Sequence, residues 1–226
     1  VDGVFFEPVE LFPQAEEINN AVVEVLGAAG IPVVLLDGDY LPFPERSRYD
    51  IVGIDNIRAA YVATRHLIDQ GAQRVDFIWR PFTATTYQRR LVGYRAALAG
   101  AGISPRSEWE HVLLPDDDEA VRLLTESGAR NIVCVNDESA ALLMRQLDRL
   151  SLRVPEDVRL VGFDDVKYAR LVRVPLTTLR QPCADLGDLA VQGMVSRLRF
   201  PEQPPRDLLL EAELVVRSSS LTPGAE

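Results

Sequence analysis

The sequence is poor in the residue types on which most catalytic and metal sites depend. It has two cysteines and two histidines in 226 residues. Neither His66 nor His111 has a cysteine, serine or carboxylate at a spacing typical of a catalytic or metal-binding set, so we expect a structural or surface role for each. Phosphate-binding glycine loops of the G-x-G-x-x-G or Lys-Ser/Thr type are absent, and Lys167 is the only lysine. The sequence therefore predicts no enzyme, no metal and no cofactor.

Positive charge and long apolar runs are also scarce. Lysine and arginine number 24 against 34 aspartates and glutamates, which gives a formal net charge of −10. Duplex DNA is bound through clustered positive charge, so we expect any DNA binding by the whole protein to reside in another segment. No apolar run approaches the roughly 18 residues that span a bilayer, which argues against a membrane partner. Two cysteines do not make a disulfide framework, and this favours a cytoplasmic location.

Strand-like and helix-like segments alternate along the whole chain. Short apolar runs rich in β-branched residues indicate buried strands, and amphipathic stretches indicate helices. Strands are expected at residues 1–6, 31–37, 51–54, 74–79, 112–114, 131–135, 158–163 and 208–216. Helices are expected at residues 11–29, 57–70, 85–99, 118–126, 138–150 and 184–200. This alternation predicts an α/β fold with parallel sheets and crossover helices.

The most informative pattern lies between Leu152 and Pro182. It reads L-R-V-P-E-D-V, then V-G-F-D-D, then P-L-T-T-L-R-Q-P, and R-L-V-G-Y from Arg90 fits the pattern R-x-x-G-Y/F/W. In this order and spacing, the motifs resemble the effector-binding core of the lactose/galactose-repressor (LacI/GalR) family of bacterial transcription regulators. The resemblance implies two Rossmann-like lobes of the periplasmic-binding-protein-like type I, with parallel sheets joined by three crossovers.

The same resemblance predicts the extent of each lobe. Residues 1–72 and 182–203 would form the first lobe, residues 73–181 and 204–220 the second, and residues 221–226 a tail. In the family, two strands and two helices precede the strand at residues 1–6, and a helix-turn-helix domain comes before them. We therefore expect the first lobe to be incomplete at its N-terminus, because a lobe without those strands would expose a sheet edge.

Asp164 and Arg90 are the leading candidates for contact with a ligand. Asp164 ends a strand, where open α/β sheets bind their ligands, and its carboxylate can accept hydrogen bonds from neighbouring hydroxyls of a sugar. The alternative is that it caps the following turn, the role that we expect for Asp165. The resemblance implies that Arg90 points into the cleft, where its planar guanidinium offers a fork of donors.

Five further residues complete the candidate set. Each also has a structural alternative: helix capping for the first, core packing for the aromatic residues, and pinning of the hinge backbone for the last two. Of the pair Asn136-Asp137, we expect Asp137 to be the better helix cap. The aromatic residues offer faces for stacking on a sugar or a base. The five candidates are Asn136, Trp79, Tyr87, Asp55 and Gln181.

The resemblance implies an effector-binding and dimerisation domain of a LacI/GalR-type transcriptional regulator. A small sugar-like ligand in the interlobe cleft would modulate DNA binding by an upstream helix-turn-helix domain, which is allostery without a reaction. The predicted partner protein is a second copy, held through the helix at residues 138–150 together with Leu171 and Val172.

Three alternatives remain open from the sequence. A periplasmic solute-binding protein of the same fold would be distinguished by a signal peptide at its true N-terminus. A purine is the second choice of ligand, because Asp164 and Arg90 can bind the edge of a base. An α/β enzyme with Asp164 and Asp137 as acid and base lacks a nucleophile, a metal set and a cofactor loop.

Overall fold

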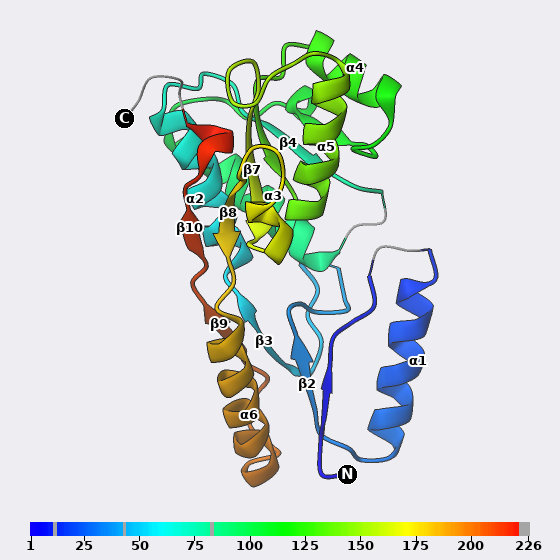
Figure 1. The fold of residues 1–226 in the computed structure, drawn as a ribbon. Coiled ribbons are helices and arrows are strands. Elements are labelled where there is room, and N and C mark those ends of the chain that lie inside the picture. The colour runs from blue at the N-terminus through cyan, green and yellow to red at the C-terminus, as the bar shows by residue number, and fades with distance from the viewer. Residues whose placement is uncertain (11–12, 43, 82–83, 222–226) are drawn as a thin grey trace. The chain divides into compact units, whose positions relative to one another are not determined.

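The chain forms two compact units, each built on its own sheet (Figure 1). The structure is a computed structural model that describes residues 1–10, 13–42, 44–81 and 84–221. The first unit comprises Val1–Asp55, Phe82–Arg89 and Pro182–Glu211, and the second comprises Asn56–Pro81, Arg90–Gln181 and Ala212–Glu226. The expected start of the first helix at Leu11 and the tail after Leu221 lie outside the described residues.

The first unit has a parallel sheet of order β1-β2-β3-β9. Its strands are β1 (Val4–Phe6), β2 (Val33–Leu36), β3 (Asp50–Ile54) and β9 (Asp207–Leu210), and its helices are α1 (Ala15–Ala28) and α6 (Cys183–Arg199). Side chains alternate between the two faces of a strand. Leu35 therefore packs with Leu26 of α1, while Val34 packs with Met194 of α6. The two helices cover opposite faces of this sheet (Figure 1).

The second unit has a mixed sheet of order β10-β8-β7-β6-β4-β5, in which only the β10–β8 pair is antiparallel among the described strands. The strands are β4 (Asp76–Trp79), β5 (Glu110–Val112), β6 (Asn131–Cys134), β7 (Arg159–Asp164), β8 (Thr177–Arg180) and β10 (Glu213–Val215). The helices are α2 (Asn56–Asp69), α3 (Thr85–Gly100), α4 (Asp118–Glu126) and α5 (Asp137–Arg149), and α3 belongs to the second unit from Arg90 onwards. The described part of this unit also contains short 3-10 helices at Ser107–Trp109, Lys167–Arg170 and Ser218–Ser220. The predicted α/β fold with parallel strands in two lobes is confirmed.

Helices close both faces of the second sheet. On one face, Leu143 and Leu147 of α5 and Leu124 of α4 pack on Ile132 and Leu160. On the other, Tyr94 of α3 lies over Phe77, with ring centroids 5.3 Å apart, and its hydroxyl donates to the carbonyl oxygen of Val75 at 2.8 Å. Strands buried on both faces read as continuous apolar runs, which is the pattern that the sequence shows at residues 160–163.

The division of the chain differs from the expected lobes at three places, one of which is Phe82–Arg89, expected in the second lobe but part of the first unit. Residues 56–72 were expected in the first lobe, but α2 packs against β6, β7, β8 and β10 and belongs to the second unit. The single final strand expected at residues 208–216 is two strands, β9 and β10. β9 pairs with β3 in the first unit and β10 with β8 in the second, because the chain crosses between the units after Glu211.

Candidate ligand-binding site

Four neighbouring strands of the second sheet end in polar or aromatic side chains. Trp79 is the last residue of β4 and Asp164 the last of β7, while Gln181 directly follows β8 and Asn136 lies two residues after β6. These strands run parallel in the order β8-β7-β6-β4, so their carboxyl ends share one edge of the sheet. In open α/β sheets, this edge is where ligands bind.

Arg90 is held at this edge by contacts on several sides. Only 2% of the residue is exposed. Its Nε donates to Oδ1 of Asn56 at 2.7 Å, and its Nη1 donates to the carbonyl oxygen of Val135 at 2.5 Å. Its Cζ lies 4.4 Å from the centre of the Phe163 ring, a cation–π distance. The guanidinium is therefore pre-oriented, with Nη2 at 3.6 Å from Oδ1 of Asp164.

Asp164 presents its carboxylate beside that guanidinium. Its side chain is 29% exposed. Its backbone has a φ of 103°, which residues other than glycine rarely adopt. Oδ1 accepts a hydrogen bond from Nε2 of Gln181 at 2.8 Å. A carboxylate has about four acceptor positions, so Asp164 has capacity beyond this one bond. An acid, a guanidinium and an amide thus meet at one point of the edge.

The capping roles expected for Asn136 and Asp137 are reversed. Oδ1 of Asn136 accepts from the backbone N–H of Ser139 at 2.9 Å, so Asn136 is the N-cap of α5. Asp137 is fully buried and binds Thr178 and the backbone of Val166 instead. An N-cap needs extended backbone, which Asn136 has, and sequence alone does not tell which of two adjacent capping residues adopts it.

Asp165 is an anchor for arginines and not the local turn cap that we expected. Its side chain is 2% exposed and accepts hydrogen bonds from Arg180 at 2.7 Å, Arg217 at 2.5 Å and Arg170 at 3.4 Å. Burial opposes its ionisation, but the hydrogen bonds from Arg180 and Arg217 outweigh burial and lower its pKa below the usual value. Asp165 therefore ties the end of β7 to β8 and to the segment after β10.

Comparison with known proteins identifies the family. A family model described as a periplasmic binding protein-like domain matches residues 64–220. This chain belongs to that family. Two solved structures match this periplasmic binding protein-like chain over nearly its whole length. One is a transcriptional regulator CelR-cellobiose complex, with a TM-score of 0.80 and 29% identity, which covers 97% of this chain and 66% of that one. The other is a LacI family transcriptional regulator from Enterococcus faecium with bound ribose, with a TM-score of 0.77 and 26% identity, which covers 99% of this chain and 80% of that one.

Curated relatives of this periplasmic binding protein-like chain are repressors. The HTH-type transcriptional repressor PurR of Vibrio campbellii is 30% identical, over 97% of this chain and 64% of the relative. The ribose operon repressor of Haemophilus influenzae is 32% identical, over 85% and 58%. The chain thus spans about three fifths of the length of these relatives. The resemblance to LacI-type effector-binding domains is confirmed.

The remaining candidates are placed differently. Trp79 lies at the edge and is half-buried, with its ring centroid 5.6 Å from that of Phe77, so it combines core packing with an exposed part. Tyr87, in α3, is 6% exposed, and the backbone N–H of Asp55 donates to the carbonyl oxygen of Leu210 at 2.9 Å. Tyr87 and Asp55 belong to the first unit, whereas the other five candidates belong to the second.

Sequence reasoning missed Asn56 and Thr178. Asn56, 3% exposed, accepts the hydrogen bond from Nε of Arg90, and Thr178, fully buried, donates to Asp137. The signal for Asn56 was present, since Asp55-Asn56 follows a strand as Asn136-Asp137 does. Thr178 gave no such signal, because a threonine within an apolar strand is also a common core residue.

The described part of the chain lacks two further features, a metal-binding cluster and a membrane-spanning helix. No group of three histidine, cysteine, aspartate or glutamate side chains there is placed to hold a metal ion. In the same residues, no helix has the length and apolar character needed to cross a membrane. Cys134 is buried, which raises the pKa of its thiol, and Cys183 is exposed; both are free.

Proposed function

We propose that this chain is the effector-binding and dimerisation part of a LacI/GalR-type transcription regulator. Its relatives are named as transcriptional repressors, and its strand-end cluster suits a small ligand. With a net charge of −10, the chain itself is a poor match for DNA, so operator binding falls to a helix-turn-helix domain elsewhere in the protein. Such a regulator acts in the cytoplasm. The ligand would alter DNA binding through its different affinities for two conformations.

The arrangement of Asp164, Arg90 and Gln181 carries this proposal. It offers one carboxylate, one guanidinium and one amide within hydrogen-bonding reach of a single small molecule. A ring with several hydroxyls suits this set, because each hydroxyl can donate to the carboxylate and accept from the guanidinium or amide. A phosphate would call for several cations. We therefore propose a sugar or sugar derivative as the effector, with Trp79 as a stacking face.

A screen by thermal shift tests the ligand class. The intact protein is heated with a panel that contains ribose, cellobiose, other sugars, amino acids and purine bases, since a purine is the second candidate. A sugar should raise the unfolding midpoint, because a ligand that binds only the folded state stabilises it. A midpoint raised by a purine and by no sugar would replace the ligand class. No response to any compound would contradict the proposed function.

Variants of two aspartates locate the site. Asp164→Ala should abolish the shift, because it removes the acceptor and leaves the buried Arg90 beside an empty position. Asp116→Ala, which removes an exposed carboxylate of the same unit, should leave the shift unchanged. A full sugar response in Asp164→Ala would show that the ligand binds elsewhere.

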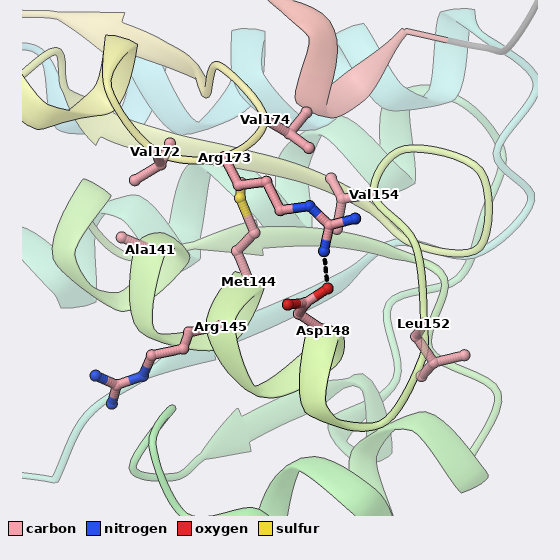
Figure 2. Close-up of a pocket in the computed structure, with 9 residues that line it drawn as sticks. All are labelled: Ala141, Met144, Arg145, Asp148, Leu152, Val154, Val172, Arg173 and Val174. Atoms are coloured by element: carbon pink, nitrogen blue, oxygen red, sulfur yellow. Dashed lines mark ion pairs between the residues drawn. The ribbon is translucent and has the colours of Figure 1, made fainter.

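The proposed dimer uses an apolar hollow on the second unit. The hollow has a volume of about 300 Å³ and lies between α5 and the segment before β8 (Figure 2). Met144, Val172 and Val174 contribute its apolar part. Arg145, Asp148 and Arg173 surround them, and Arg173 forms an ion pair with Asp148. An apolar centre with charges of both signs at its rim suits a self-complementary two-fold contact.

Sedimentation equilibrium of the intact protein tests this contact. We expect a dimer at micromolar concentration. Leu171 is 74% exposed and adjoins Val172 of the hollow, so Leu171→Asp should shift the mass towards one chain. Leu114→Asp changes another exposed leucine of the same unit and should leave the dimer intact. A wild-type mass of one chain would contradict the proposed dimer.

A further inference from the structure

Asp137 forms hydrogen bonds that hold the segment that carries Asp164. Its side chain is fully buried at the first residue of α5. Oδ1 accepts from the hydroxyl of Thr178 at 2.6 Å, and Oδ2 accepts from the backbone N–H of Val166 at 3.0 Å. The same Thr178 hydroxyl accepts from the backbone N–H of Asp165 at 3.3 Å. Two successive backbone N–H groups after Asp164 are thus held, one directly and one through Thr178.

The segment Asp164–Val166 begins with two residues of unfavourable backbone conformation, which hydrogen bonds must stabilise. Asp164 has a φ of 103° and Asp165 a φ of 52°. Residues other than glycine pay about 1–3 kcal/mol for conformations of this kind and keep them only where the surroundings over-determine them. The two hydrogen bonds of Asp137, together with the arginines that bind Asp165, supply that determination. They therefore hold the backbone from which the Asp164 side chain extends.

The neighbouring strand makes room for the Asp137 carboxylate. A Cβ added to Gly162 of β7 would lie 2.4 Å from Oδ1 of Asp137, which is closer than real Cβ contacts come. The helix start does not require Asp137, because Asn136 already caps α5. A carboxylate is expensive to bury, and one that is kept without a capping role points to another use.

Burial raises the pKa of Asp137 to about 7, even though Thr178 and Val166 hydrogen-bond to it. The titratable groups around it are Asp164 at the end of β7, Asp165 directly after it, the thiol of Cys134 in β6, and Tyr168 in the turn that follows. The two aspartates raise its pKa further. Either protonation state keeps both contacts, since a neutral carboxyl can donate to the Thr178 hydroxyl and accept from Val166.

We propose that Asp137 is a positioning residue for the effector site: through Thr178 and the Val166 N–H, it holds Asp164 in the orientation that binds the ligand. This inference rests on the proposed function, because Asp164 is the ligand contact proposed above. Asp137 itself does not touch the ligand. Its loss should weaken binding although the residues that contact the ligand are unchanged.

Two matched pairs of variants separate the hydrogen bonds from the space that the side chains fill. Asn at position 137 can donate to the Thr178 hydroxyl and accept from Val166, so Asp137→Asn keeps both contacts, whereas Asp137→Ala removes both. Thr178→Ser keeps the hydroxyl, whereas Thr178→Val keeps the shape without it. Leu124→Ala, in the buried core of α4, serves as a control that is destabilised without touching the segment.

Titration calorimetry of the intact variants with ribose, the sugar bound in the Enterococcus faecium structure, gives the first readout. Asp137→Ala and Thr178→Val should each weaken binding by about tenfold or more, the factor that one hydrogen bond typically contributes. Asp137→Asn, Thr178→Ser and Leu124→Ala should stay within about threefold of wild type. If Asp137→Ala and Thr178→Val bind like wild type, or if Leu124→Ala weakens binding as much as they do, the positioning role is wrong.

Amide hydrogen exchange at Asp165 and Val166 gives a second readout that needs no ligand. Exchange should be about tenfold faster or more in Asp137→Ala and Thr178→Val, and unchanged in the Asn and Ser variants. If wild-type protein binds neither ribose nor any compound of the panel, the proposed function fails while this measurement still decides whether Asp137 holds the segment. Equal exchange in all variants would overturn the inference. Should Asp137→Ala not fold, Thr178→Val carries both readouts.

Discussion

The two units differ in how much of their apolar surface they cover. In the second unit, α5 buries Leu143 and Leu147 completely against the sheet. In the first unit, α6 buries Ala190 and Met194 but leaves Val195 and Leu198 about half exposed, at 49% and 45%. The described sheets differ in the same direction, with four strands in the first unit and six in the second. The better-covered unit is the one that carries the proposed effector site.

The closer packing of the second unit suits it to carry a binding site. A site that depends on orientations within a few tenths of an ångström needs a rigid support, and close packing provides it. Arg90, Asp164 and Gln181 all rise from elements of the second unit. Leucine-to-alanine and glycine-to-alanine substitutions made in both units test this contrast directly.

Loss of a leucine side chain should lower the free energy of unfolding far more in α5 of the second unit than in α6 of the first. Leu147→Ala, fully buried in α5, should lower the free energy of unfolding by about 2–5 kcal/mol, because it loses apolar burial and leaves a cavity. Leu198→Ala, 45% exposed in α6, should change it by about 0.5 kcal/mol or less. Urea denaturation measures both. Equal losses would show that the face of α6 is covered as completely as that of α5.

The stability of the second unit should fall as the pH rises, through Asp137. Burial raises its folded-state pKa from 3.8 to about 7. Its contribution is therefore most favourable below the unfolded pKa and is lost as the pH rises towards the folded value. Between about pH 5 and pH 8, wild type should lose about 2–3 kcal/mol relative to Asp137→Asn, which does not titrate. Parallel unfolding midpoints of the two proteins across this range would contradict a buried, titrating Asp137.

Two glycines should respond in opposite directions. Gly162→Ala should destabilise the second unit by about 1–3 kcal/mol, because the new methyl group meets the Asp137 carboxylate. Gly187→Ala, in α6 with nothing within 4 Å of the added Cβ, should stabilise the first unit by about 0.5–1 kcal/mol through helix propensity. Thermal denaturation of both variants is the measurement. A gain in stability from Gly162→Ala would show that β7 is not crowded at this point.

The smallest expected effect is on DNA. Neither unit should shift duplex DNA in a gel at physiological salt, because the 226 residues carry a net charge of −10. The intact protein, with its proposed helix-turn-helix domain, is the positive control. Saturable binding by these residues alone at micromolar concentration would contradict the assignment of DNA binding to another segment.

Sequence alone determined the fold class and predicted residues of the candidate site. Strand and helix patterns alternate along the chain. This order predicts parallel sheets, because each helix returns the chain to the end of the sheet where the next strand begins. The pattern R-L-V-G-Y and the acidic end of the strand at residues 158–163 led to Arg90 and Asp164, which the structure places 3.6 Å apart. Each of these signals is local, contained within a few consecutive residues.

Only the tertiary structure decided how three similar carboxylates divide their roles. Asp137, Asp164 and Asp165 all lie at or just after the ends of buried strands, and nothing local distinguishes a buried anchor from a partly exposed carboxylate. Arg217 binds Asp165 from 52 residues away, and Thr178 binds Asp137 from 41 residues away. Likewise, the split between β9 and β10 depends on which distant strand each segment meets, β3 or β8. Such choices are set by long-range pairing, which leaves no periodic trace in the sequence.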